Sequence, residues 1–200
     1  GASIGVAVYP DDARNADGIM RAADAALNMA KAEGRGQYQF FTPELNRRAH
    51  RQLALEVRLH KALANQEIYL EFQPQMDLRT GRIVGAEALM RWKNADLGQV
   101  SPVEFIPVAE ECGVIIELGE WALYQVVQQL RQWHSVGRND VRLSVNISPL
   151  QLRHAMFMEQ IVQLVREGGF DPTLLELELT ERVLVNAPEK AIEFFAVMRS

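Results

Sequence analysis

Residues 83–92 read IVGAEALMRW, and this stretch decides the kind of fold that the chain can adopt. In an extended strand, successive side chains point to opposite faces. Glu87, Leu89 and Arg91 therefore share one face, and apolar residues occupy the other: Ala86, Ala88 and Met90. We expect helices to cover the apolar face, which leaves the polar face available for binding or chemistry.

Two later stretches divide in the same way. Residues 141–148 read VRLSVNIS and residues 174–181 read LLELELTE, with apolar side chains recurring at every second position. The polar residues between them take the opposite face: Ser144, Asn146, Glu176, Glu178 and Thr180. Covered by helices on one side, these strands would aim Glu87, Asn146 and Glu178 at a common interior.

Carboxylates aimed at a shared interior need cations or a change of protonation, because burying them unpaired is very costly. Hard oxygen donors without His or Cys suit Mg²⁺, Mn²⁺ or Ca²⁺ better than zinc. In parallel α/β architectures such sites lie at the carboxyl ends of the strands, where these residues fall. The pattern alone leaves a second interpretation open, in which each acid faces solvent or forms a salt bridge, with Arg91 as a partner for Glu87.

The order of predicted elements indicates an α/β chain in two parts. A strand–helix–strand unit is predicted over residues 1–41, and Thr42-Pro43 caps a linker helix that runs to about Asn65. Beyond it we expect an antiparallel hairpin around residues 77–81, and then helices and strands in alternation, which is typical of parallel strands. An open doubly wound sheet and the first half of a barrel both satisfy this pattern, although no glycine-rich phosphate loop follows any strand.

Capping signals predict where the later helices begin. Ser101-Pro102-Val103-Glu104 predicts a capping box, and a longer helix is expected from about Glu117 to His134. Ser148-Pro149 opens a helix that is expected to run to about Arg166, and Asn186-Ala187-Pro188-Glu189 opens the last one.

Charge and cysteine content exclude several classes of protein. The net charge of −5 argues against a general nucleic-acid binder, which normally has a basic surplus. The single cysteine, Cys112, excludes a disulfide framework and a thiolate metal cluster, and favours a reducing compartment. Charges interrupt every apolar stretch well short of the ~20 residues that a membrane span needs, so no membrane segment is expected.

Both ends of the chain lead us to expect further segments. The chain begins directly in a predicted strand at residues 2–9, and it stops inside a predicted amphipathic helix at residues 194–198. A strand without a preceding partner and a helix without a stop signal are typical of a piece of a longer protein.

Several motifs, in order, resemble those of a known family. Residues 87–92, EALMRW, preceded by Phe72-Gln73-Pro74, resemble the start of an EAL domain, the cyclic diguanylate phosphodiesterase family. Asn146 in SVNIS and Glu178 in ELTE match two further family motifs, and the FIPVAE stretch at residues 105–110 fits as well. The resemblance covers about residues 51–200.

Residues 1–41 resemble the end of a GGDEF domain, the diguanylate cyclase fold. The resemblance lies in ASIGVA at residues 2–7, AADAAL at residues 22–27 and KAEGR at residues 31–35. It implies that Lys31 and Arg35 occupy positions that contact GTP phosphates. The glycine-rich signature and the metal-binding acids of a cyclase are absent from the 200 residues, so the resemblance implies no cyclase activity for this chain.

These resemblances imply a fold class and a domain organisation. The fold is expected to be α/β, a partial TIM-like (β/α) barrel of the EAL type with an antiparallel first strand, preceded by the strand–helix–strand remnant of an α+β GGDEF domain. Residues 1–41 form that remnant, residues 42–65 form the linker helix, and residues 66–200 form the N-terminal portion of the EAL-like domain.

The EAL resemblance also implies roles for individual residues in a site for two Mg²⁺ or Mn²⁺ ions. Glu87, Asn146 and Glu178 match ligands of the first metal, and Glu181 matches an acid that anchors a later loop without binding metal. The substrate-contacting positions are matched by Gln73, Leu89 and Arg91, the last of which can neutralise phosphate charge.

The function implied by the resemblance is the metal-dependent hydrolysis of cyclic di-GMP to linear pGpG in bacterial second-messenger signalling. The family's paired aspartates, the lysine near its attacking water and its last metal-binding glutamate would lie beyond Ser200, so the 200-residue chain by itself is expected to be inactive. The alternatives are a cyclic di-GMP sensor that does not hydrolyse its ligand and a structural domain that acts through partner contacts.

The resemblance further implies partners and a location. Cyclic di-GMP, a homodimer formed through the EAL domain, and an upstream sensory or GGDEF domain are the expected partners, and nucleic acid is not. The expected location is the cytoplasm, where any anchoring to the inner membrane would come from upstream segments.

Overall fold

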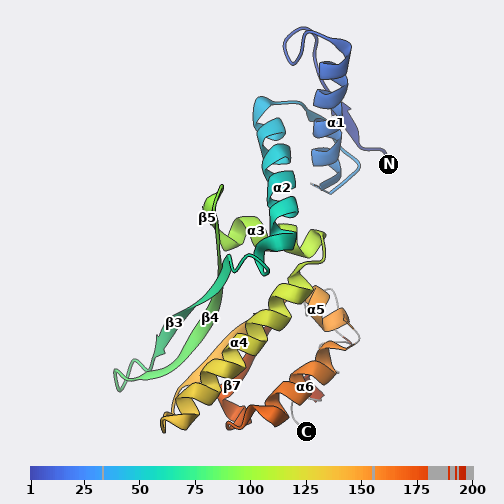
Figure 1. Ribbon diagram of the computed structural model, residues 1–200. Helices are drawn as coiled ribbons and strands as arrows, with labels where there is room; N and C mark the ends of the chain where they lie inside the picture. The colour runs from blue at the N-terminus through green and yellow to red at the C-terminus, as the bar shows by residue number, and fades with distance from the viewer. Residues whose placement is uncertain (33, 155, 180–188, 190–191, 193, 197–200) are drawn as a thin grey trace. The chain divides into compact units, whose positions relative to one another are not determined.

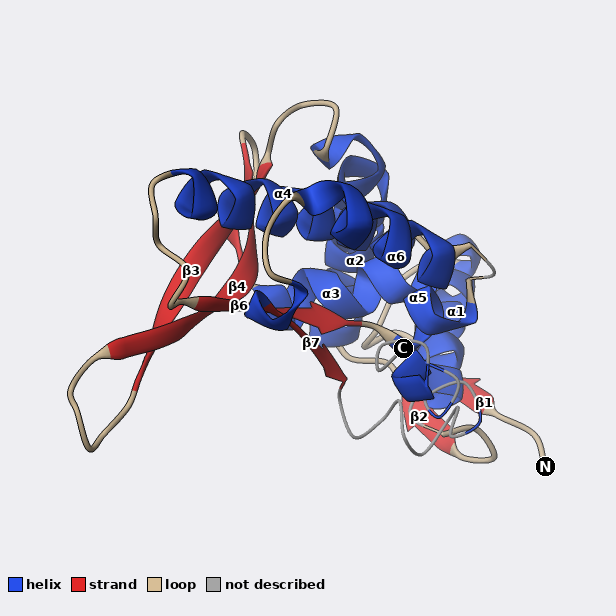
Figure 2. Ribbon diagram, turned by 90° about the horizontal axis from the view of Figure 1, so that it is seen from below, coloured by secondary structure: helices blue, strands red, loops and turns tan. Residues whose placement is uncertain are grey.

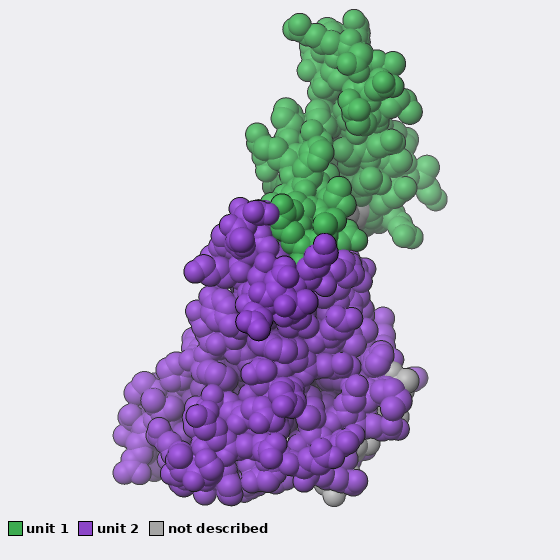
Figure 3. Space-filling model, in the orientation of Figure 1, with its two compact units in different colours: residues 1–58 green, residues 59–200 purple. Residues whose placement is uncertain are grey.

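The computed structural model describes residues 1–32, 34–154, 156–179, 189, 192 and 194–196. The chain divides into two compact units, residues 1–58 and residues 59–200 (Figure 3). Glu181 and the predicted helix start at Asn186 lie outside the described residues.

The first unit contains the strand–helix–strand arrangement that the sequence predicts. Strands β1 (Ile4–Val6) and β2 (Tyr38–Phe40) pair in parallel, and α1 (Ala16–Ala32) connects them. Gly5 permits this helix to lie directly on β1, because a Cβ atom at that position would come within 2.0 Å of the carbonyl oxygen of Ala23. The face of α1 that packs inward carries small buried residues: Ala22, Ala26 and Ala30.

Helix α2 (Pro43–Ala62) follows, and the division between the two units falls within it. The Thr42 hydroxyl oxygen accepts a hydrogen bond from the backbone N–H of Leu45 at 3.3 Å, which confirms the predicted cap. The helix ends three residues before the predicted Asn65, and Gln66 takes a left-handed conformation with φ of 57°. A right-handed helix cannot continue through such a residue.

The second unit is built on a mixed sheet with the strand order β3-β4-β6-β7. The first strand is antiparallel to its neighbour, and the next three run parallel to one another. A short strand that the sequence did not predict, β5, pairs antiparallel with the end of β4. The strands have the following bounds: β3 Ile68–Met76, β4 Ile83–Asn94, β5 Gly98–Val100, β6 Arg142–Ile147 and β7 Leu175–Leu179.

The hairpin between β3 and β4 forms where it was predicted, and its turn is held by Asp77. The Asp77 carboxylate accepts hydrogen bonds from the backbone N–H groups of Thr80 at 2.8 Å and Arg79 at 2.9 Å. These backbone hydrogen bonds hold the pKa of Asp77 below its ordinary value. Gly81 closes the turn with φ of 68°, a conformation that glycine adopts without strain.

Helices cover one side of this sheet, as expected from the apolar faces of its strands. Helices α4 and α6 lie along that side (Figures 1 and 2), and their buried side chains join those of the strands in one core. The helices of this unit are α3 Pro102–Glu111, α4 Ile115–Ser135, α5 Pro149–Arg153 and α6 Phe157–Gly168, with a 3₁₀ turn at Pro172–Leu174. The predicted α/β class and the antiparallel first strand are therefore confirmed.

Two helix predictions were wrong in detail. The single helix expected from Pro149 to Arg166 is two helices, because His154 has an extended backbone with ψ of 122° that ends α5. The capping box expected at Ser101 is absent, since its side chain makes no capping hydrogen bond. A complete capping box occurs instead at Ser148 and Gln151. Both helices begin with Ser-Pro, so the local pattern does not distinguish them.

In the described part of the chain, no helix has the length and apolar character that crossing a bilayer requires.

Candidate metal and substrate site

The two faces of the main sheet differ in the way that the strand sequences predict. Side chains on the face toward α4 and α6 belong to the apolar core: Ala86, Ala88, Leu143, Val145 and Ile147, with Leu175, Leu177 and Leu179 packed against them. The neighbouring residues along each strand point to the opposite face. That face carries the predicted metal ligands.

Glu87 and Asn146 meet on the polar face although 59 residues separate them in the chain. The Asn146 side-chain Nδ2 donates a hydrogen bond to Glu87 Oε1 at 2.7 Å. Asn146 is the register partner of Glu178 on the next parallel strand, and Glu87 is the partner of Ser144. Paired residues of adjacent strands point to the same face of a sheet, so all three predicted ligands lie on one face, on β4, β6 and β7.

The donor set on this face suits a hard divalent cation. The hydrogen bond between Asn146 and Glu87 uses the amide nitrogen of Asn146 and Glu87 Oε1. The amide oxygen Oδ1 of Asn146 and Glu87 Oε2 take no part in it. Among the described residues, no group of three His, Cys, Asp or Glu side chains could hold a metal ion by itself. Two carboxylates and one amide oxygen form a partial set of ligands, and Mg²⁺ commonly keeps several waters.

Ser144 lies beside Glu87 on this face and has an unusual environment. The residue is 2% exposed, and its hydroxyl oxygen has no hydrogen-bond partner among the described residues. A buried hydroxyl without a partner is costly. The strand pattern predicted that Ser144 lies on the polar face, but it did not predict that its hydroxyl would be buried without a described partner.

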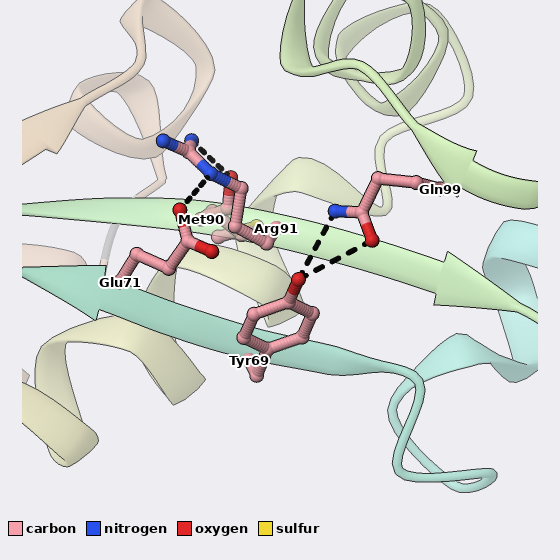
Figure 4. Close-up of polar contacts among 5 residues, drawn as sticks. All are labelled: Tyr69, Glu71, Met90, Arg91 and Gln99. Carbon is pink, nitrogen blue, oxygen red and sulfur yellow. Dashed lines mark hydrogen bonds and ion pairs between the residues drawn. The ribbon is translucent and has the colours of Figure 1, made fainter.

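Arg91 forms its ion pair with Glu71 on β3, and not with Glu87 as the salt-bridge interpretation suggested. The Arg91 Nε donates to Glu71 Oε2 at 2.7 Å, and Nη1 donates to the carbonyl oxygen of Met90 at 3.1 Å (Figure 4). The side chain of Arg91 is 22% exposed and that of Glu71 is 55% exposed. The pair therefore lies near the edge of the site, where a bound phosphate could compete for the guanidinium.

A cavity of about 280 Å³ adjoins these residues. Leu89, Arg91 and Asn146 are among the residues that line it, together with apolar side chains of α3 and α4. Gln73, the third residue expected to contact substrate, is the register partner of Glu87 across the β3–β4 ladder and is exposed. The predicted substrate positions thus lie on strands β3 and β4, next to the predicted metal ligands.

The sequence did not predict the polar network that holds the end of β4. Glu67 Oε2 accepts hydrogen bonds from Trp92 Nε1 at 3.0 Å and from Asn94 Nδ2 at 2.9 Å. Burial raises the pKa of Glu67, but hydrogen bonds from Trp92, Asn94 and Asn65 outweigh it and hold the pKa below its ordinary value. Trp92 follows Arg91 directly, so the network fixes the strand beside the site.

The remaining predicted positions lie elsewhere. Lys31 is exposed in the last turn of α1, and Arg35 is exposed in the turn that follows, with φ of 60°. Both belong to the first unit. Their suggested contact with phosphates stays a prediction.

Comparison with known proteins identifies relatives of the second unit and of the chain as a whole. Residues 56–200 match the family model described as the EAL domain. The chain is 38% identical over 190 residues to the cyclic di-GMP phosphodiesterase PdeR of Escherichia coli K12, covering 95% of this chain and 28% of that protein. It is also 38% identical over 180 residues to the bifunctional diguanylate cyclase/cyclic di-GMP phosphodiesterase MucR of Pseudomonas aeruginosa, covering 90% of this chain and 26% of that protein.

Solved structures of EAL proteins have the same fold. The PaMucR phosphodiesterase in its cyclic di-GMP complex superposes with a TM-score of 0.69 at 30% identity, covering 73% of this chain and 59% of that one. The EAL enzyme Bd1971, with cAMP and cyclic di-GMP bound, gives a TM-score of 0.68 at 31% identity, covering 76% of this chain and 42% of that one. These similarities favour the EAL-type barrel over an open doubly wound sheet. The chain spans about a quarter of the length of the two curated relatives.

Proposed function

Because the chain belongs to the EAL domain family, we propose that it supplies the first half of a site that hydrolyses cyclic di-GMP to linear pGpG in bacterial signalling. The observation that carries the proposal is the 2.7 Å contact between Asn146 and Glu87, with Glu178 in register beside Asn146. Three separate strands bring these oxygen donors to one face. Relatives named as cyclic di-GMP phosphodiesterases support the choice of substrate.

In the proposed site, Glu87, Asn146 and Glu178 would hold a divalent cation, Mg²⁺ or Mn²⁺. A bound divalent cation lowers the pKa of water and neutralises phosphate charge. Hydrolysis adds the oxygen of water to one phosphorus and breaks its bond to the ribose 3′ oxygen, which leaves as a hydroxyl. The second metal and the residues that hold it would come from the part of the domain beyond this chain.

The substrate would lie against β3 and β4, over the cavity that Leu89 and Arg91 help to line. Arg91 would place its guanidinium beside a phosphate, because its planar N–H groups match phosphate oxygens. Leu89 would offer an apolar surface, and Gln73 would offer an amide for hydrogen bonding. Glu181, outside the described residues, would anchor a later loop.

We also infer the setting in which this site works. The relative named as bifunctional supports a GGDEF-like identity for residues 1–41, with residues 42–65 as the linker helix and residues 66–200 as the EAL portion. Dimerisation through the EAL domain and an upstream sensory or GGDEF domain are part of the proposal. A cytoplasmic location is also part of it and is favoured by the single cysteine.

The test compares variants of the natural full-length protein with Mg²⁺ and cyclic di-GMP, following pGpG by ion-exchange chromatography. Glu87→Ala should reduce turnover by at least about 100-fold, because it removes a charged ligand of the cation. The fold should persist, since the side chain is only partly buried on the polar face. Glu176→Ala is the matched control, because it removes an exposed acid from the face of β7 that also carries Glu178.

Three results would count against the proposal. Unchanged hydrolysis by Glu87→Ala would show that this face does not carry the reaction. Calorimetric binding of cyclic di-GMP by the wild-type protein without any pGpG would assign the domain to the sensors that bind their ligand and leave it intact. Absence of both binding and hydrolysis would favour a purely structural domain.

A further inference from the structure

The carboxyl end of β6, which carries Asn146, is followed by a capping box that involves a fully buried glutamine. Gln151 in α5 is 1% exposed, and its Oε1 accepts a hydrogen bond from the backbone N–H of Ser148 at 2.9 Å. Its own backbone N–H donates to the Ser148 hydroxyl oxygen at 3.3 Å. Ser148 lies two residues after Asn146, so these bonds hold the chain where it leaves the site.

The backbone at Asn146 needs such support because its strand is paired on one flank only at this point. The register between β6 and β7 continues through Ile147, whereas that between β4 and β6 ends at Ala88 and Val145. Asn146 therefore lies one residue beyond the last pair with β4, the strand that carries Glu87. The placement of its amide against Glu87 depends on how the following two residues are held.

Gly119 in α4 makes room for the glutamine. A Cβ atom at position 119 would lie 2.0 Å from Gln151 Nε2 and 2.4 Å from its Cδ. Glycine is unfavourable inside a helix, and this contact gives a packing reason for it. Gln151 Nε2 has no hydrogen-bond partner among the described residues. The side chain is therefore held by the hydrogen bond to its Oε1 and by its packing against the backbone of α4 at Gly119.

We propose that Gln151 is a positioning residue for the metal-binding amide of Asn146, and that Gly119 is required to admit it. This inference rests on the proposed function of the polar face. Gln151 would act on the cation only through Ser148 and the backbone of β6, although it also helps to line the cavity beside the site. Displacing its amide would loosen the chain at Asn146 and weaken cation binding.

The experiment measures Mn²⁺ binding to the full-length protein by titration calorimetry, independently of turnover. Gly119→Ala forces Gln151 away from Ser148, and Gln151→Met removes the acceptor while keeping the side-chain volume. Each should weaken Mn²⁺ binding about tenfold, the lower end of what loss of a ligand-orienting group causes. The Mn²⁺ affinity of the double variant should be no lower than that of Gln151→Met alone, because both changes act through the same hydrogen bond.

Gly168→Ala is the matched control. A Cβ atom there would lie 2.3 Å from the Phe170 ring, so it creates a similar clash within α6, away from the end of β6. It should lower the melting temperature without changing Mn²⁺ affinity.

Unchanged Mn²⁺ affinity in both Gly119→Ala and Gln151→Met would overturn the proposal, and so would an equal loss in Gly168→Ala. The wild-type titration separates this failure from that of the proposed function. If the wild-type protein binds no Mn²⁺, the proposed function fails and this inference fails with it. If the wild type binds and the variants bind equally well, only the positioning role is refuted.

Discussion

Glu67→Ala should destabilise the second unit through the loss of two partly buried hydrogen bonds. The carboxylate accepts from Trp92 Nε1 at 3.0 Å and from Asn94 Nδ2 at 2.9 Å, and these two residues are 0% and 7% exposed. A hydrogen bond to a charged group contributes about 1.5–3 kcal/mol, and a buried donor left unpaired is costly. Because Glu67 is itself only partly buried, water can replace part of these hydrogen bonds. We therefore expect the free energy of unfolding to fall by about 3 kcal/mol.

Urea unfolding of the purified protein, followed by tryptophan fluorescence and circular dichroism, measures this loss directly. In thermal unfolding the same change should lower the melting temperature by about 6–12 °C for a unit of this size. Glu67→Gln is the control, because the amide oxygen can still accept both hydrogen bonds. It should lose about 1 kcal/mol, the difference between a charged and a neutral acceptor.

The sign of the pH dependence follows from the lowered pKa of Glu67. A carboxyl group whose pKa is lower in the folded state contributes its full stabilisation above the unfolded-state pKa, about 4.3. That contribution is lost as the pH falls through the lower folded-state value. The difference in unfolding free energy between wild type and Glu67→Gln should therefore be constant near neutral pH and narrow as the pH falls below the unfolded-state pKa. A Glu67→Ala variant within about 0.5 kcal/mol of wild type, the range of ordinary surface changes, would refute the reasoning.

Two further changes test the site. Glu71→Gln removes the ion pair with Arg91, and since Glu71 is 55% exposed the pair should be worth less than about 1 kcal/mol to stability. It frees the guanidinium for phosphate, so calorimetry should show cyclic di-GMP binding about threefold more tightly, and weaker binding would contradict a role for Arg91 at phosphate. Ser144→Ala removes a buried hydroxyl that has no partner among the described residues, so it should raise the unfolding free energy by about 1 kcal/mol. A loss of stability in urea unfolding would mean that the hydroxyl does have a partner.

Local chemistry made much of the fold predictable. The two-residue alternation in residues 83–92 and in the later strands assigned the side chains of β4, β6 and β7 to the correct faces, because successive side chains of a strand point to opposite sides. Asp77 and Gly81 bracketed the hairpin turn, since a side chain that accepts turn N–H groups and a residue that tolerates positive φ are both local requirements. The predicted helix ends were less accurate, and the break at His154 was not predicted, because tertiary packing competes with local preference at these positions.

The sequence by itself determined which residues share the polar face and which oxygen donors it offers: Glu87, Asn146 and Glu178. Only the tertiary structure decided what each of them meets. Arg91 pairs with Glu71, and Gln151 lies against Gly119 on another helix. Strand periodicity is a property of the backbone over a few residues, whereas these contacts depend on strand register and helix placement between distant segments. Short sequence patterns carry no information on either.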